Sequence, residues 1–175
     1  MKQSGVRWLW AAVLVIALDQ VVKWLMVVNL SPYEPHHVLP VLDITLMYNT
    51  GAAFNFLASA GGWQRWAFIV LSTLVSLGII WWLTTLHAVR HRLLSFALSL
   101  ILGGAIGNAI DRVRLGRVVD FIYPHWNDHW FAAFNVADSA ITVGAVLLLL
   151  DALLESASSK KTQIISKGTG RGAST

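Results

Sequence analysis

Two aspartates, Asp120 and Asp138, combine a residue type suited to acid–base chemistry with positions beside long apolar runs. Asp138 belongs to the stretch FNVADSAITVGAVLLLL, which has the composition of a membrane span from Ala140 onward. A carboxylate at the centre of a bilayer costs roughly 2.5–3.5 kcal/mol by insertion scales, so Asp138 should lie in a polar pocket. Asp120 comes ten residues after the preceding apolar run, at the same predicted face of the membrane.

Two converging carboxyl groups would act as one acid–base unit. Like charges at close range raise one pKa strongly, so the pair would share a proton. One carboxyl group would serve as general base on water while the other acts as general acid. Because such a pair titrates as a unit, neither role is assigned to one aspartate alone.

A simpler interpretation of the two acids stays open. Asp138 can cap the helix that follows, where an acid gains about 0.3–1 kcal/mol from the helix dipole. Asn135 is an even better cap candidate. Asp120, taken alone in a loop, is most simply a solvated residue.

Other charged and polar residues lie within or beside the apolar runs. Asp19 and Lys23 are spaced i, i+4 with the acid first, the favourable order for a helical pair. They either neutralise each other inside a helix bundle or support a site. Asn108, Asp111 and Arg112 form a polar cluster, in which Arg112 either binds a carboxylate or lipid phosphate or makes a surface ion pair.

The glycines of GGAIGNAIDR have two possible roles. The spacing Gly103-x-x-x-Gly107 permits close approach of another helix. The same small residues could instead leave room for a substrate beside the helix.

Residue types exclude several other chemistries. The chain has no cysteine, which excludes disulfides, thiol catalysis and Cys-ligated metals. The pairs His87/His91 and His125/His129 are spaced i, i+4, but neither has the Glu of H-E-x-x-H. The serine-hydrolase elbow, the P-loop and the dinucleotide-binding pattern are also absent from the sequence. We therefore expect no metal and no cofactor.

Composition places the chain among membrane proteins. Of its 175 residues 56% are hydrophobic and only 13% charged, which is too apolar for a soluble domain of this size. The net charge of +4 does not form a basic stripe, so we expect no nucleic-acid partner. The first apolar segment carries Asp19 and Lys23 and is followed by no Ala-x-Ala-like site, so we expect it to be retained rather than cleaved.

The predicted fold is an all-α membrane protein with four transmembrane helices, a small extracytoplasmic β-sheet and a short interfacial helix. Each apolar segment is close to the ~20 residues that a helical span needs. The four spans are about 8–28, 66–86, 93–110 and 136–154. They form a single predicted domain over 1–155, and the Ser/Gly/Lys-rich segment 156–175 is expected to be a disordered cytoplasmic tail.

The positions of Lys and Arg predict how the chain is oriented across the membrane. Eight lie in the N-terminus, the 87–92 link and the tail, whereas four lie in the two remaining loops. Both termini should therefore be cytoplasmic, with loops 29–65 and 111–135 on the outer face.

The two outer loops differ in pattern. HHVLPVLDITLMYNTGAAFNFL has β-branched and alternating apolar positions broken by Pro40 and Gly51, which predicts a short sheet or hairpin. In the second loop, Trp126, Trp130 and Phe131 could line one side of a short interfacial helix.

Four stretches together resemble the motifs of the lipoprotein signal peptidase family, also called signal peptidase II (aspartyl peptidase family A8). They are LDQVVKW, YNTGAAFNFL, GGAIGNAIDRVRLGRVVDFI and FNVADSAI, in order and with appropriate spacing over roughly 8–155. Val22 stands where Ser or Thr is common in that family, and Asn55 where Ser is common.

The resemblance implies an aspartyl endopeptidase of the bacterial cytoplasmic (inner) membrane with its active site near the periplasmic face. Such an enzyme removes signal peptides from diacylglyceryl-modified prolipoproteins by cleaving just before the lipidated cysteine, and globomycin inhibits the family. By position within VVDF and NVAD, the catalytic pair corresponds to Asp120 and Asp138. The implied supporting residues are Asp19, Lys23, Asn49, Gly51, Asn108, Arg112 and Asn135. Membrane lipids are the other expected partners, and a monomer is expected.

Two non-enzyme classes compete with a peptidase. Intramembrane Asp and Lys also occur in ion-coupled carriers, but four spans without an inverted repeat argue against a transporter. A structural membrane protein held by glycine-rich helix contacts would not need Asp120 or Asp138.

Overall fold

Four long helices and one small sheet make up the computed structural model, which describes residues 4–51, 62–127 and 129–170. A short 3-10 helix, η1 (Gly5–Trp8), leads into α1. The long helices are α1 (Leu9–Asn29), α2 (Trp63–Thr85), α3 (Arg92–Leu115) and α4 (Val136–Gly170). In the described part of the chain, 4 helices are long and apolar enough to cross a membrane, which confirms the predicted number of spans.

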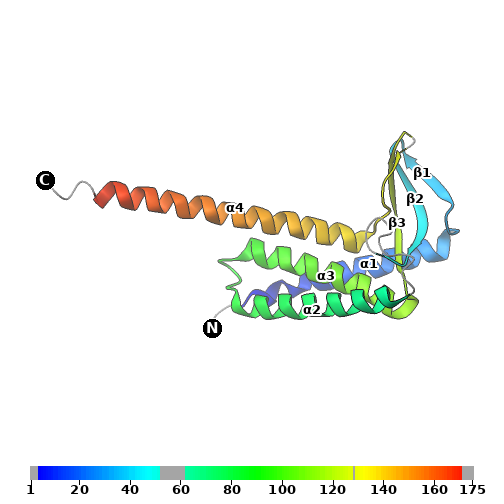
Figure 1. Ribbon diagram of the computed structural model, residues 1–175, viewed down its shortest axis with the longest axis horizontal. Coiled ribbons are helices and arrows are strands. Elements are labelled where there is room, and N and C mark those ends of the chain that lie inside the picture. Colours follow the sequence, from blue (N-terminus) through cyan, green and yellow to red (C-terminus); the bar gives the residue numbers. More distant parts are fainter. Residues whose placement is uncertain (1–3, 52–61, 128, 171–175) are drawn as a thin grey trace.

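Helix α3 is the centre of the bundle. In its most apolar window 56% of the residues are buried, against 28% or less in the other three helices. The large apolar side chains of α1, α2 and α4 are mostly exposed on the outside of the bundle. In Figure 1 the four helices run alongside one another, and the sheet stands across one end.

Glycines bring α3 unusually close to its neighbours. A Cβ atom on Gly103 would lie 2.8 Å from the carbonyl oxygen of Ala12 in α1, and one on Gly104 would clash with the carbonyl oxygen of Ala137 in α4. These contacts confirm the packing interpretation of the glycine motif.

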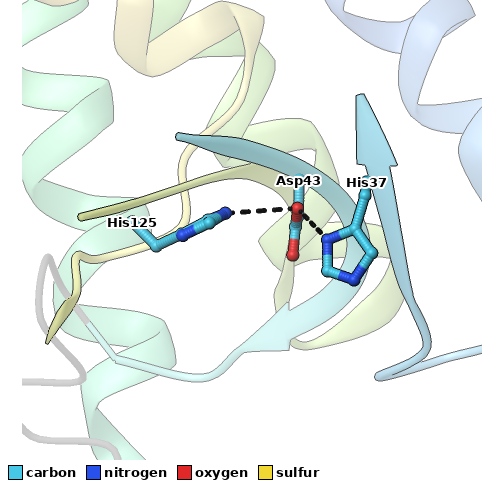
Figure 2. A group of neighbouring side chains, drawn as sticks. All are labelled: His37, Asp43 and His125. Carbon is cyan, nitrogen blue, oxygen red and sulfur yellow. Dashed lines mark hydrogen bonds and ion pairs between the residues drawn. The ribbon is translucent and has the colours of Figure 1, made fainter. Parts of the chain in front are cut away.

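The sheet has four antiparallel strands in the order β1-β2-β3-β4. They are β1 (Pro35–Leu39), β2 (Leu42–Asn49), β3 (Val118–Trp126) and β4 (His129–Trp130). The predicted hairpin in the first loop is thus confirmed by β1 and β2. Asp43 of β2 lies buried between His37 of β1 and His125 of β3 (Figure 2).

Strand β3 follows α3 after a tight turn. Gly116 has φ 74°, and its N–H donates to the carbonyl of Arg112, a left-handed helix ending that favours glycine. The chain then pairs with β2, with Met47 opposite Asp120. Ile122 and Phe134 exchange backbone hydrogen bonds, so β3 also holds the segment that enters α4.

The prediction of an interfacial helix in the second loop is wrong for the described residues. Trp126 ends β3 and Trp130 lies in β4, while Phe131 follows the strand. A run of β-branched and aromatic residues from Val118 favours a strand, and Pro124 disfavours a helix interior. The spacing of the aromatic residues alone does not reveal that the segment from Val118 pairs with β2.

The fourth helix continues beyond the predicted span of 136–154, whereas its apolar part, Val136–Ala157, is close to that prediction. Helix α4 continues from Val136 to Gly170, so the described part of the expected disordered tail, 156–170, is helical. Figure 1 shows α4 projecting far beyond the other helices. The segment contains no proline and no glycine before Gly168, so nothing in its backbone chemistry stops the helix after the apolar residues end.

Replacing Gly104 with alanine should destabilise the bundle. The new Cβ would meet the Ala137 carbonyl and lie 2.7 Å from Ile141 Cγ1, so α3 and α4 must move apart. We expect Gly104→Ala to lower the free energy of unfolding by about 1–3 kcal/mol, measured by thermal unfolding in detergent.

The matched control is Gly78→Ala in α2, where the added Cβ would have no heavy atom within 4 Å. Alanine has the higher helix propensity, so stability should be unchanged or slightly raised. Equal losses in the two variants would contradict the close packing of α3 against α4.

Candidate active site

A cavity of about 660 Å³ lies where α3, the sheet and the start of α4 meet. Its polar lining includes Asn49, Asn108, Arg112, Asp120 and Asp138, together with the hydroxyl residues Ser139 and Thr142. The two acids therefore face one cavity although they lie on different elements.

Asp120 is held on β3 by two amide groups. Its Oδ2 accepts a hydrogen bond from Asn49 Nδ2 at 3.1 Å, and its Oδ1 accepts one from Asn135 Nδ2 at 2.8 Å. Burial, followed by the nearby charge of Asp138, raises the pKa of Asp120 from its ordinary value of 3.8 to about 6. The two amide hydrogen bonds oppose that rise because they favour the carboxylate.

Asp138 lies in the first turn of α4, where it and Asn135 cap the helix reciprocally. Asn135 Oδ1 accepts from the Asp138 N–H at 2.9 Å, and Asp138 Oδ2 accepts from the Asn135 N–H at 3.2 Å. This is the geometry of a capping box. The other oxygen, Asp138 Oδ1, accepts from Asn108 Nδ2 at 2.7 Å at the cavity wall. The capping and active-site interpretations of Asp138 are thus compatible.

Asn135 links the two acids directly. Its side chain is completely buried. The amide oxygen accepts from the backbone of Asp138, while the amide nitrogen donates to Asp120 and also lies within hydrogen-bond distance of Asn108 Oδ1. One side chain therefore sets the spacing between both carboxyl groups.

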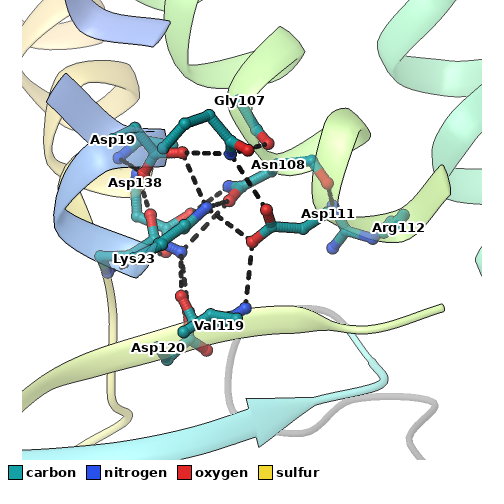
Figure 3. Close-up of polar contacts among 12 residues, drawn as sticks. Asp19, Lys23, Gly107, Asn108, Asp111, Arg112, Val119, Asp120 and Asp138 are labelled. Atoms are coloured by element: carbon teal, nitrogen blue, oxygen red, sulfur yellow. Dashed lines mark hydrogen bonds and ion pairs between the residues drawn. The ribbon is translucent and has the colours of Figure 1, made fainter. Parts of the chain in front are cut away.

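A buried ammonium group, that of Lys23, lies among the polar side chains of this region (Figure 3). Lys23 Nζ is 2.8 Å from Asp19 Oδ2, 2.9 Å from Asp111 Oδ2 and 3.0 Å from Asn108 Oδ1. The predicted Asp19–Lys23 pair is therefore present, with Asp111 as a second acid. These contacts use all three ammonium protons, so Lys23 neutralises and positions its neighbours rather than serving as a base.

The remaining predicted residues also reach this region. Asn49, besides its bond to Asp120, accepts the N–H of buried Gly51 at 2.9 Å. Arg112 lines the cavity, and its guanidinium donates to the carbonyl oxygens of Gly51 and Asn108 at 3.3 and 3.4 Å. Its carbon atom Cζ lies 4.8 Å from the ring centroid of Phe68. All of the predicted site residues thus lie in one connected region.

Two residues of this network, Gln20 and Asp111, are not among the site residues predicted from the sequence. Gln20 Nε2 lies 3.2 Å from Asp19 Oδ2 and 3.0 Å from Asp111 Oδ1, joining the two acids that flank Lys23. A polar residue beside Asp19 in an apolar span was the available signal. Asp151, in contrast, lies thirteen residues along α4 from Asp138, roughly 20 Å away at the helical rise.

This arrangement can move protons. Two carboxyl groups face one cavity, and one of them has a pKa near neutrality. Such a pair can accept a proton from water and return one to a leaving group.

Comparison with known proteins agrees with these features. The family described as Signal peptidase (SPase) II matches residues 11–154. A lipoprotein signal peptidase of Pseudomonas aeruginosa PAO1 is 54% identical over 146 residues, covering 82% of this chain and 86% of the relative. One from Acinetobacter baumannii is 51% identical over 144 residues, with 82% and 81% covered. A solved bacterial membrane enzyme has TM-score 0.78 and 31% identity, covering 91% of this chain and 96% of its own.

The raised pKa of Asp120 should be visible in infrared difference spectra. Since burial favours the neutral form, the carbonyl stretch of protonated Asp120 should be present in acid and lost as the pH rises through about 6. Asp120→Asn should lack this band, and Asp151→Asn should keep it. Identical spectra for wild type and Asp120→Asn across this range would contradict the assignment.

Removing the buried cation should be far more harmful than removing an exposed one. Lys23→Met leaves Asp19 and Asp111 buried without their counter-ion, a loss of about 3–5 kcal/mol in the free energy of unfolding. The exposed Arg90→Met should change little. Thermal unfolding in detergent compares them, and similar midpoints would show that Lys23 does not hold the site together.

Proposed function

This chain belongs to the signal peptidase II family, and we therefore propose that it removes signal peptides from prolipoproteins by aspartyl chemistry at Asp120 and Asp138. The observation that carries the mechanism is the convergence of these two acids on one cavity through Asn135. The cleaved bond is the one just before a cysteine that carries diacylglyceryl.

The dyad holds one proton between its two carboxyl groups. The ionised carboxylate takes a proton from water as the water oxygen bonds to the scissile carbonyl carbon, whose π electrons move to its oxygen. The tetrahedral intermediate then collapses. Its C–N bond breaks as the protonated carboxyl group donates its proton to the leaving amine.

The cavity wall suits a lipid-linked substrate. Beside the acids it is lined by apolar residues of the chain entering α4 and of α4 itself, including Phe134, Ile141 and Val143. Val143 is exposed on the outside of the bundle, so the cavity extends to the surface that faces lipid. The acyl chains can remain in the bilayer while the peptide bond reaches the dyad. Binding in this way holds the scissile bond beside the catalytic groups, so the chemical step becomes effectively unimolecular.

Supporting roles follow from the contacts. Asn49, Asn108 and Asn135 orient the carboxyl groups, and Asp19 with Lys23 positions the elements that carry them. Arg112 is placed to bind a lipid phosphate or a substrate carbonyl beside the dyad. A globomycin-type inhibitor would occupy the same cavity.

The chain is a multi-pass membrane protein of a bacterial family. We place both termini in the cytoplasm, with the sheet and the dyad near the periplasmic face of the inner membrane, because Lys and Arg are concentrated at the opposite end. The peptidase domain is assigned to 1–155 and acts as a monomer.

Replacing either acid with asparagine should abolish cleavage. An asparagine in place of Asp138 keeps an oxygen that can accept the capping hydrogen bond, so the fold should persist while proton transfer is lost. We expect Asp120→Asn and Asp138→Asn each to lower kcat by at least about 10²–10⁴-fold. The assay is cleavage of a diacylglyceryl-modified lipobox peptide by purified protein in lipid.

The matched control is Asp151→Asn on the same helix as Asp138, which should retain activity. Circular dichroism checks that every variant is folded. A fully active Asp120→Asn or Asp138→Asn variant would remove the basis for the aspartyl mechanism.

A further inference from the structure

A second group of ionisable side chains lies on the sheet, away from the dyad. His37, Asp43 and His125 come from the three adjacent strands β1, β2 and β3 (Figure 2). His125 lies five positions after Asp120 on β3, roughly 17 Å along an extended strand. The proposed peptidase chemistry does not use this group.

Strand register puts the three side chains on one face. His37 and Asp43 are direct partners across β1 and β2, and Asp43 is opposite Tyr123 on β3. His125 follows Tyr123 by two residues, so its side chain points to the same face, diagonal to Asp43.

The three ligand atoms converge on a small space. Asp43 Oδ1 is 2.7 Å from His37 Nδ1 and 3.3 Å from His125 Nε2, and all three atoms lie within 4.8 Å of one another. Tetrahedral zinc with ligand distances of about 2.0–2.1 Å separates its donor atoms by roughly 3.3 Å. To reach this separation the His37–Asp43 contact would open by about half an ångström, and the nitrogens of His37 and His125, which lie within 4.8 Å of each other, would also have to come to about that distance.

Two buried atoms at this place lack hydrogen bonds. Asp43 is completely buried, yet its Oδ2 has no hydrogen-bond partner among the described residues. His125 Nε2 is likewise buried without one, because its approach to Asp43 does not have hydrogen-bond geometry. Buried polar atoms are almost always satisfied, so these two point to a missing partner.

We propose that His37, Asp43 and His125 bind a divalent cation of the Zn²⁺ class. Two imidazoles and one carboxylate are donors that zinc accepts, and three protein ligands leave a fourth position for water. The His37 side chain is 75% exposed, so an ion can reach the site from solvent. The ring of Trp130 lies 4.5 Å from that of His125 and restricts its orientation.

The ion would join three strands. β1 is an exposed edge strand at every position, and its ligand His37 would be tied through the ion to β3. The ion would thereby reinforce the pairing of β2 with β3, which also places Asn49 beside Asp120. Metal binding should raise the unfolding temperature of the protein without being required for cleavage.

The test uses the full chain without a histidine tag, purified in detergent and stripped of metal. Zn²⁺ binding is measured by calorimetry, and Co²⁺ binding by its visible absorption spectrum. We expect about one ion per chain, which replaces the direct contact between His37 Nδ1 and Asp43 Oδ1.

Three variants remove the ligands: His37→Ala, Asp43→Asn and His125→Ala. Each should weaken Zn²⁺ binding at least about 100-fold and abolish the Co²⁺ spectrum, because loss of even an outer-shell partner costs 10–100-fold. His37 is largely exposed, so its variant should fold even if Asp43→Asn does not.

The matched controls are His36→Ala, next to His37 on the same strand, and His129→Ala on β4. Both should bind Zn²⁺ like wild type. Equal loss in His36→Ala and His37→Ala, or undiminished binding in His37→Ala and His125→Ala, would overturn the proposal. So would the absence of any Zn²⁺ binding, which would leave a hydrogen-bonded histidine–aspartate group. None of these outcomes bears on the aspartyl dyad.

Discussion

The site depends on one buried ammonium group, Lys23, held between Asp19 and Asp111. Each acid uses a second interaction to hold a different element. Asp19 Oδ1 accepts the N–H of Ala137 at 2.9 Å, and Asp111 Oδ2 accepts the N–H of Val119 at 3.1 Å.

These two backbone groups immediately precede the proposed catalytic pair. Ala137 comes before Asp138, and Val119 comes before Asp120. The cation in α1 therefore positions both acids through one acidic neighbour each, without touching either dyad carboxylate in a hydrogen bond. Breaking a buried charge network of this kind costs several kcal/mol of folding free energy, so the folded protein strongly favours this arrangement.

The surrounding charges also explain why the pKa of Asp120 is raised. Four acids surround this region, and the buried or half-buried cations beside them are Lys23 and Arg112. Full ionisation would leave an excess of negative charge in a poorly solvated cavity. A raised pKa at Asp120 relieves part of that excess, and it fits the proposed mechanism, in which the two acids share one proton.

Structural features that depend on neighbouring residues could be predicted from the sequence, whereas features that depend on contacts between distant segments could not. The four spans follow from their length and mostly apolar composition, and Asp138 could be identified because a carboxylate stands out at the edge of such a run. Strand β3 could not be identified from its own residues as a partner of β2, and the aromatic spacing alone therefore predicts a helix for Trp126, Trp130 and Phe131. The group of His37, Asp43 and His125 was missed for the same reason, because only the register of three strands brings these residues together.

The glycines of α3 show how packing and polarity are combined. Gly103 and Gly104 allow the backbones of α1 and α4 to approach, as expected for helix packing. Gly107 allows a side chain of α1 to approach, since a Cβ there would lie 2.7 Å from Asp19 Oδ2. Its missing side chain makes room for the carboxylate that binds Lys23 and the start of α4. The packing interpretation of the motif therefore applies at all three glycines, because the space at Gly107 is occupied by the carboxylate of Asp19 and not by a substrate.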